Sequence, residues 1–102
     1  MLEAQDWQVD VCMDGLTALG KITSDNKYDL LLLDDGLPIV SGMELVRRAR
    51  QLAHRKRTPI IILSASDCAG EARRAGADKF LKKPDDLDTL VKTVARMLAT
   101  QK

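Results

Sequence analysis

The chain has 102 residues, of which 45% are apolar, and its 16 basic and 15 acidic side chains leave a formal net charge of +1. This length excludes a second hydrophobic core, so residues 1–102 are expected to form a single domain. The balanced charge gives no indication of a nucleic acid or membrane partner, and no apolar run is long enough to cross a bilayer. A polar N-terminus and two cysteines without metal-ligand spacing, Cys12 and Cys68, predict a cytoplasmic protein.

The chain before residue 28 predicts a strand followed by a helix. Apolar residues alternate over residues 7–13, which indicates a strand near a sheet edge. Asp14 is the expected N-cap of the helix that follows. Its inward face is predicted to carry Leu16, Leu19 and Ile22.

Four consecutive leucines, Leu30 to Leu33, run directly into the two acids Asp34 and Asp35. A short, wholly apolar run bounded by turn residues is typical of a strand buried on both faces, as in parallel sheets covered by helices. In such sheets ligands bind just outside the carboxyl ends of the strands. Asp34 is therefore the first candidate for a functional residue.

A helix is predicted after the loop that follows these acids. Ser41 and Glu44 have the spacing of a capping box, which satisfies free backbone donors at a helix start. The helix is expected to run to about residue 53. Three of its apolar side chains are predicted to face the core: Met43, Val46 and Ala49.

The second half of the chain predicts two more strands, each followed by a helix. Residues 60–63 form a second continuous apolar run, which ends at Ser64. A short helix over residues 66–75 is closed by Gly76, in the position favoured for a left-handed C-cap. A brief strand at residues 79–81 then leads to two lysines. The final helix, about residues 86–100, carries one apolar stripe: Leu87, Leu90, Val91, Val94, Met97 and Leu98.

This alternation predicts an α/β fold, with a parallel sheet of four strands and about four helices. The carboxyl ends of parallel strands meet at one edge, so Asp34, Ser64 and Lys83 are expected to converge. A carboxylate, a hydroxyl and an ammonium around one crevice suit phosphoryl transfer to the carboxylate. The aspartate attacks phosphorus, while the lysine and serine stabilise the transferred oxygens.

The order and spacing of three segments resemble the receiver domain of two-component response regulators: DLLLLDDGLP with a following SG, PIIILSAS, and AGADKFLKKP. The resemblance covers nearly the whole chain and implies the flavodoxin-like, CheY-like doubly wound fold. By resemblance, Asp34 matches the phosphoacceptor, Ser64 the switch residue and Phe80 the aromatic switch residue. Lys83 matches the lysine that precedes a cis-proline, Pro84.

The chain also departs from the family pattern. Receivers begin with a strand that ends in an acidic pair, and this pair forms part of the Mg²⁺ site. This sequence starts near the end of the following helix, so that strand, most of that helix and the pair are expected to be absent. Asp34 and the backbone carbonyl of Gly36 remain as implied Mg²⁺ ligands. Asp35 is a candidate second carboxylate; the alternative is a solvated loop acid.

In the family's strand order, 2-1-3-4-5, the missing strand lies between the predicted strands at 7–13 and 29–33. Either these two strands pair directly, or a partner chain fills the gap, or the chain is a marginally folded fragment. Because unpaired strand edges promote association, a homodimer is expected.

The resemblance implies a signalling module and not an enzyme. A histidine kinase or phosphotransfer protein would phosphorylate Asp34, and Ser64 and Phe80 would alter binding of a downstream protein target. No output domain is expected within the 102 residues. The alternative is a pseudo-receiver, a phosphorylation-independent interaction or dimerisation module, which the absent acidic pair favours. The basic run over residues 47–57 is interpreted as a solvated helix face, so no direct contact with nucleic acid is predicted.

Overall fold

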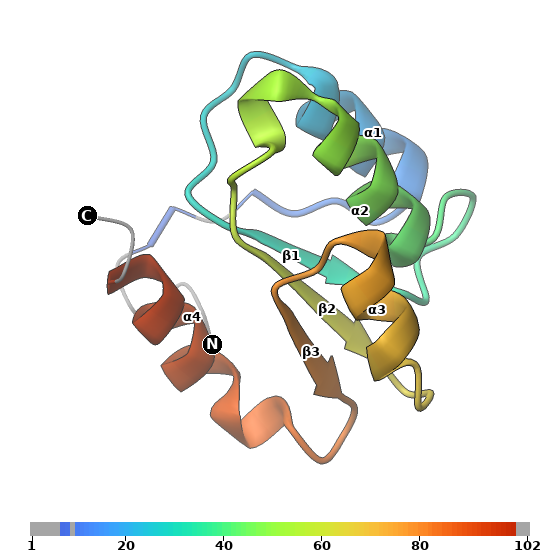
Figure 1. The fold of residues 1–102 in the computed structure, drawn as a ribbon, viewed down its shortest axis with the longest axis vertical. Coiled ribbons are helices and arrows are strands. Elements are labelled where there is room, and N and C mark those ends of the chain that lie inside the picture. The colour runs from blue at the N-terminus through green and yellow to red at the C-terminus, as the bar shows by residue number, and fades with distance from the viewer. Residues whose placement is uncertain (1–6, 9, 100–102) are drawn as a thin grey trace.

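A parallel sheet of three strands lies at the centre of the fold (Figure 1). The structure is a computed structural model, and it describes residues 7, 8 and 10–99. The strands, in their order across the sheet, are β1 (Leu31–Asp34), β2 (Ile60–Ser64) and β3 (Lys79–Lys82). Asp34 is in register with Leu63, and Ser64 with Lys82. The carboxyl ends of all three strands therefore meet at one edge.

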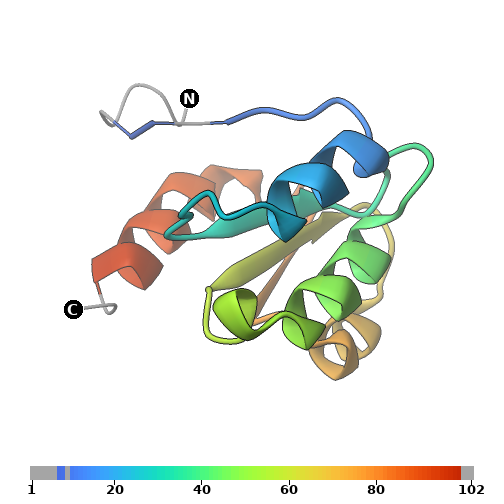
Figure 2. The same cartoon turned by 90° about the horizontal axis from the view of Figure 1, so that it is seen from above.

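Helices cover both faces of this sheet, as Figures 1 and 2 show. One face carries α1 (Gly15–Thr23), α2 (Gly42–Gln51) and α3 (Ala69–Ala75), and the other carries α4 (Leu90–Ala99). Two single turns of 3-10 helix also occur, η2 (Ala53–Arg55) after α2 and η3 (Leu87–Thr89) before α4. A parallel sheet between two helical layers confirms the predicted fold class.

The side chains of β2 alternate between two hydrophobic cores. Ile60 and Ile62 pack with the side chains of α1, α2 and α3, whereas Ile61 packs with Leu90 and Val94 of α4. All three isoleucines are 0% exposed. A strand covered on both faces has no side chain that reaches water, which explains why this segment is apolar throughout.

The caps predicted from the sequence form at three helix ends. Asp14 Oδ1 accepts a hydrogen bond of 2.7 Å from the backbone N–H of Thr17 at the start of α1. At the start of α2, Ser41 Oγ accepts one of 3.2 Å from the backbone N–H of Glu44. Gly76 closes α3 with a φ of 116°, in the left-handed region that favours glycine.

The predicted strand over residues 7–13 does not form in the described part of this range, from which residue 9 is excluded. Residues 7, 8 and 10–13 lie outside the sheet, and within the described chain β1 pairs only with β2. The carboxylate of Asp10 instead binds Lys21 Nζ at 2.7 Å and Tyr28 Oη at 2.9 Å, which holds this segment beside α1. A strand requires neighbouring backbone groups at hydrogen-bonding distance, and here a groove separates the segment from β1. Among the residues that the structure describes, the sheet thus has three of the four predicted strands, without the suggested direct pairing.

The inward face of α1 also differs from the prediction. Leu16 is 57% exposed, whereas Gly15, Ala18 and Ile22 are buried. The backbone N–H of Gly15 donates a hydrogen bond of 2.9 Å to the carbonyl of Pro38, so α1 begins against the loop after β1. The helix thus packs against the core through Gly15, Ala18 and Ile22, and Leu16 lies on its outer side.

The basic run over residues 47–57 is only partly a solvated face. Arg55 is 2% exposed, and its guanidinium donates to backbone carbonyls at the end of α1. The side chain of Arg50 is 20% exposed and binds the carboxylate of Asp78 and the carbonyl of Gly76. The solvated-face interpretation is therefore wrong for these two arginines, because unpaired carbonyls at chain turns recruit them into the structure.

No helix in the described part of the chain combines the length and apolar character needed to cross a membrane.

Candidate functional site

Two of the predicted site residues form an ion pair at the carboxyl edge of the sheet. Asp34 is the last residue of β1, and Lys83 directly follows β3. Lys83 Nζ lies 2.7 Å from Asp34 Oδ2, although the residues are 49 positions apart in the chain. The side chain of Lys83 remains 32% exposed and that of Asp34 39% exposed. A group that arrives from solvent can therefore reach both.

The surroundings of Asp34 favour its ionised form. Partial burial disfavours the charge, but hydrogen bonds from Lys83 and from the backbone N–H of Gly36 outweigh it, so the pKa of Asp34 is below its ordinary value of 3.8. The Gly36 N–H donates to Asp34 Oδ1 over 2.9 Å. At neutral pH the side chain is a carboxylate, and each oxygen retains a further lone pair. Asp34 is thus available as an oxygen nucleophile.

Ser64 reaches the same edge at the end of β2. Its carbonyl accepts a hydrogen bond of 2.8 Å from the backbone N–H of Lys83, and its hydroxyl oxygen accepts one of 3.1 Å from the N–H of Ser66. Ser64 is 4% exposed. Since the contact with Ser66 uses only a lone pair, the hydroxyl hydrogen remains available to donate. The structure therefore places Asp34, Ser64 and Lys83 at neighbouring strand ends.

The loop after Asp34 depends on a close approach that sequence reasoning missed. A Cβ atom on Gly42 would lie 2.9 Å from the carbonyl oxygen of Asp34 and 3.0 Å from the Cα of Asp35. Helix α2 therefore begins against the backbone that carries Asp34, at a distance that only glycine allows. The sole signal for this contact was a glycine placed directly after the predicted N-cap, Ser41.

The described residues supply only part of a Mg²⁺ site. Among residues 7, 8 and 10–99, no group of three or more His, Cys, Asp or Glu side chains is placed to hold a metal. Asp35, the candidate second carboxylate, accepts a hydrogen bond of 3.3 Å from the backbone N–H of Met43. Mg²⁺ demands octahedral oxygen ligation, usually from one or two carboxylates together with phosphate oxygens. These residues do not make a preformed Mg²⁺ site.

Phe80 lies half-buried on the face of β3 that α3 covers. It packs against the core beneath α1, α2 and α3, and it lines a small pocket of about 250 Å³ together with Ala72 and Arg73 of α3. The pocket is open to solvent, so part of the surroundings of Phe80 is solvent and not packed core.

A second ion pair, which the sequence did not reveal, joins the ends of β2 and β3. Lys82 Nζ lies 2.7 Å from Asp67 Oδ1, and the hydrogen bond that Lys82 donates to Asp67 raises the pKa of Lys82. Two adjacent lysines follow Leu81 in the sequence, and successive side chains along a strand point to opposite faces. Lys82 and Lys83 therefore meet different carboxylates, Asp67 and Asp34.

Comparison with known proteins agrees with this geometry. The chain is 40% identical over 103 residues to the response regulator ArlR of Staphylococcus saprophyticus. The matched region covers 98% of this chain and 45% of that protein. It is 39% identical over 104 residues to the phosphate regulon transcriptional regulatory protein PhoB of Rhizobium meliloti, covering 99% and 45%. The chain thus spans less than half the length of these relatives.

Solved structures give the same result. The receiver domain of the Francisella response regulator 1452 superposes with a TM-score of 0.86 at 32% identity, covering 99% of this chain and 84% of that one. The receiver domain of the sensor histidine kinase PA1611 from Pseudomonas aeruginosa, which holds a magnesium ion in its active site cleft, gives 0.82 at 28% identity, covering 96% and 82%. The family model of the response regulator receiver domain matches residues 1–95. The chain therefore belongs to the receiver domain family of two-component response regulators, a family of signalling modules.

Proposed function

We propose that Asp34 accepts a phosphoryl group from a phosphorylated histidine of a kinase or phosphotransfer protein. The observation that carries this proposal is the ion pair between Lys83 Nζ and Asp34 Oδ2, 2.7 Å long and partly exposed at the carboxyl edge of the sheet. The pair brings an ionised nucleophile into contact with a cation, and this cation can bind the phosphoryl oxygens once they are transferred.

The transfer step forms one P–O bond and breaks one P–N bond. An oxygen of Asp34 attacks phosphorus, and the imidazole of the donor leaves with the electron pair of the P–N bond and takes up a proton from solvent. The product on this chain is an acyl phosphate at Asp34. Lys83 stabilises negative charge on the transferred oxygens, and Ser64 donates its hydroxyl hydrogen to one of them.

The hydroxyl of Ser64 and the ring of Phe80 carry the signal away from Asp34. When the Ser64 hydroxyl moves to donate to a phosphoryl oxygen, it keeps its contact with the N–H of Ser66, which donates to it, so the loop between β2 and α3 shifts with it. This loop leads into the helix whose residues line the pocket beside Phe80. The ring then changes its exposure, and with it the surface offered to a downstream protein target.

Magnesium would supply electrostatic stabilisation of the phosphoryl group when it binds. Its candidate ligands in this chain are Asp34 and the carbonyl of Gly36, with Asp35 as a further carboxylate. The oxygens that these residues provide fall short of octahedral ligation. Lys83 and Ser64 act on the phosphoryl oxygens directly, independently of the ion.

The second candidate is a phosphorylation-independent interaction or dimerisation module. The observation that favours it is the lack of a metal-binding acidic group among the described residues. In this case Asp34 and Lys83 would stabilise the carboxyl edge of the sheet, without chemistry. We expect neither candidate to contact nucleic acid directly, because Arg47 and Arg48 are ion-paired to acids of the same face.

Intact-mass measurement after incubation with acetyl phosphate and Mg²⁺ distinguishes the two candidates. We expect a gain of one phosphoryl group by the native chain and none by Asp34→Asn. Asp35→Ala is the matched variant: loss of the adduct there would assign Asp35 to the metal site. No adduct on a chain that circular dichroism shows to be folded would refute phosphorylation and favour the interaction module.

A further inference from the structure

The loop between β1 and α2 packs closely against the start of α1. Its residues 35–40 follow Asp34 and lead to the N-cap of α2. The carbonyl of Pro38 accepts two hydrogen bonds of 2.9 Å, one from the backbone N–H of Gly15 and one from that of Val40. The first residue of α1 is thus bonded to the backbone of this loop.

Only glycine fits at position 15 in this arrangement. A Cβ atom there would overlap the carbonyl oxygen of Val40, and it would lie 2.6 Å from the carbonyl carbon and 2.7 Å from the Cβ of the same residue. Carbon atoms pack at about 3.5–4.0 Å, so either the helix or the loop would have to retreat by about 1 Å. The contact between α1 and the loop therefore depends on the absence of a side chain at position 15.

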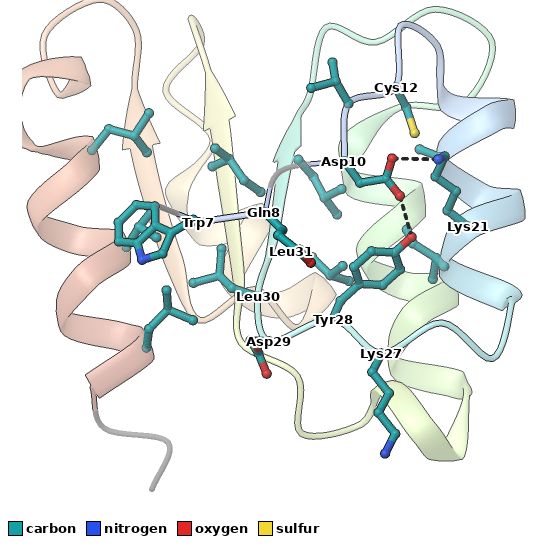
Figure 3. Close-up of a pocket in the computed structure, with 18 of the residues that line it drawn as sticks. Trp7, Gln8, Asp10, Cys12, Lys21, Lys27, Tyr28, Asp29, Leu30 and Leu31 are labelled. Carbon is teal, nitrogen blue, oxygen red and sulfur yellow. Dashed lines mark hydrogen bonds and ion pairs between the residues drawn. The ribbon is translucent and has the colours of Figure 1, made fainter. Parts of the chain in front are cut away.

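Helix α1 is the more rigid partner in this contact. Its side chains Ala18 and Ile22 are buried in the core, and the guanidinium of Arg55 donates to the carbonyl of Ile22 at 2.9 Å. Figure 3 shows the ion pair of 2.7 Å that also joins Lys21 of this helix to Asp10. The helix is held along its length, so an atom added at its start displaces the loop.

The loop is the partner that yields. Pro38 and Ile39 are exposed, and Ile39 has a φ of 74°. The hydrogen bond from the N–H of Val40 to the carbonyl of Pro38 around this φ makes a γ-turn of the rare, strained kind. Strained backbone persists only where neighbouring contacts hold it, and the contact with Gly15 is one of them.

The same loop orients the carboxylate of Asp34. The backbone N–H of Gly36 donates to Asp34 Oδ1 over 2.9 Å, while Lys83 Nζ lies 2.7 Å from Oδ2. The N–H of Leu37 donates to the carbonyl of Asp34 over 3.3 Å. Because Pro38 follows these two donors directly, a displaced Pro38 moves both of them and leaves the carboxylate free to turn.

We propose that Gly15 is a positioning residue for phosphoryl transfer to Asp34. It allows α1 to support the loop after β1, and this loop fixes the orientation in which the carboxylate attacks phosphorus. Gly15 acts through Pro38 and Gly36 and not on the phosphoryl group itself. The inference rests on the proposed acceptor role of Asp34.

The rate constant for phosphorylation of the 102-residue chain by acetyl phosphate and Mg²⁺, followed by intact mass, measures this effect. In Gly15→Ala we expect it to fall about tenfold, since a small misplacement of a reacting group slows its reaction strongly. The amide proton of Gly36 gives a second readout. In NMR spectra of unphosphorylated Gly15→Ala it should shift upfield relative to the native chain, because it loses its hydrogen bond to the carboxylate.

Two control variants separate this effect from a loss of stability. Gly20→Ala makes the same substitution in the same helix, where, its own helix backbone apart, no atom of the described chain lies within 4 Å of the added Cβ. Val94→Ala removes buried methyl groups from the core beneath α4, so it destabilises the fold on the other face of the sheet. For both folded variants we expect a rate constant within about twofold of the native value and an unshifted Gly36 proton.

Asp14→Ala provides the test if Gly15→Ala does not fold. It adds no atom to the contact. It removes the carboxylate that accepts the hydrogen bond of 2.7 Å from the N–H of Thr17, and so loosens the first turn of α1. We expect a smaller decrease in the rate constant, about threefold, and an upfield shift of the Gly36 proton.

An unchanged rate constant or an unshifted Gly36 proton in folded Gly15→Ala would overturn the proposal, as would the same result for Asp14→Ala where Gly15→Ala is unfolded. An equal decrease in Val94→Ala would also overturn it, because the loss would then follow stability and not the loop. The absence of an adduct on the native chain has a different meaning: it refutes the acceptor role of Asp34, and the positioning role of Gly15 falls with it.

Discussion

Arg55 provides a stability test of the packing between α1 and the segment after α2. Arg55 is 2% exposed, and among the described residues its guanidinium is paired with no carboxylate. It donates to the carbonyls of Ile22 at 2.9 Å, Ser24 at 3.1 Å and Asn26 at 2.6 Å. It also lies 5.0 Å from the ring centroid of Tyr28. We expect the substitution Arg55→Met to destabilise the fold strongly.

The size of the effect follows from the acceptors left behind. Methionine keeps much of the apolar volume of the arginine stem, so the loss of packing is small. A hydrogen bond to a charged group contributes about 1.5–3 kcal/mol, and a buried acceptor left unpaired costs about 1–3 kcal/mol. Ser24 keeps a contact of 2.9 Å with His54 Nε2, which leaves Ile22 and Asn26 as the main losses. The expected decrease in the free energy of unfolding is about 3 kcal/mol.

Urea unfolding followed by circular dichroism measures this loss. The matched control is Arg57→Met, because Arg57 is exposed two positions away and has no hydrogen bond or ion pair with the described residues. We expect Arg57→Met to change the free energy of unfolding by less than about 0.5 kcal/mol. A difference of less than about 1 kcal/mol between the two variants would refute the role assigned to the Arg55 hydrogen bonds.

Three further predictions concern the loop that carries Asp34. Gly42→Ala forces a Cβ to within 2.9 Å of the Asp34 carbonyl oxygen. We therefore expect urea unfolding to show a decrease of about 1–3 kcal/mol in the free energy of unfolding, together with a lower phosphorylation yield. An unchanged yield would contradict the close approach. Ile39 has a φ of 74° and is 75% exposed. Ile39→Gly should raise the free energy of unfolding by about 0.5 kcal/mol, since relief of about 1–2 kcal/mol of left-handed strain exceeds the entropic cost of glycine; a destabilised variant would contradict this. The lowered pKa of Asp34 stabilises the fold above the unfolded-state pKa, and this contribution is lost as pH falls through the folded-state pKa. On acidification, the free energy of unfolding of the native chain should therefore fall by up to about 1 kcal/mol relative to that of Asp34→Asn, as measured by urea unfolding at several pH values. The effect is small because the ion pair is partly exposed. A difference between the two proteins that does not change with pH would contradict this prediction.

Local sequence patterns were sufficient for the elements that are buried on both faces. The apolar runs before Asp34 and Ser64 predict β1 and β2, because a strand between two helical layers has no polar face. Since parallel strands align their carboxyl ends, the same patterns predict that Lys83 meets Asp34, and the ion pair confirms it.

The wrong predictions concern residues whose structure depends on tertiary contacts. Residues 7–13 alternate as a strand does, but pairing requires a neighbour, and the ion pair of Asp10 with Lys21 holds the described part of this segment away from β1. Arg55 lies in a basic run that resembles a solvated helix face, and only the fold reveals the carbonyls of α1 that surround it. For Gly42 the sequence offers only a glycine after the predicted N-cap, and the backbone that passes within contact distance is visible only in the fold.

The central claim is that Asp34 is the phosphoryl acceptor of this chain. The most direct test is to treat the chain with acetyl phosphate, reduce it with borohydride, which converts an aspartyl phosphate to homoserine, and map the peptides by mass spectrometry. We predict homoserine at position 34 alone, and a lower yield in Lys83→Met. Homoserine at Asp35 or another acid, or none in a chain shown to be folded, would contradict the account.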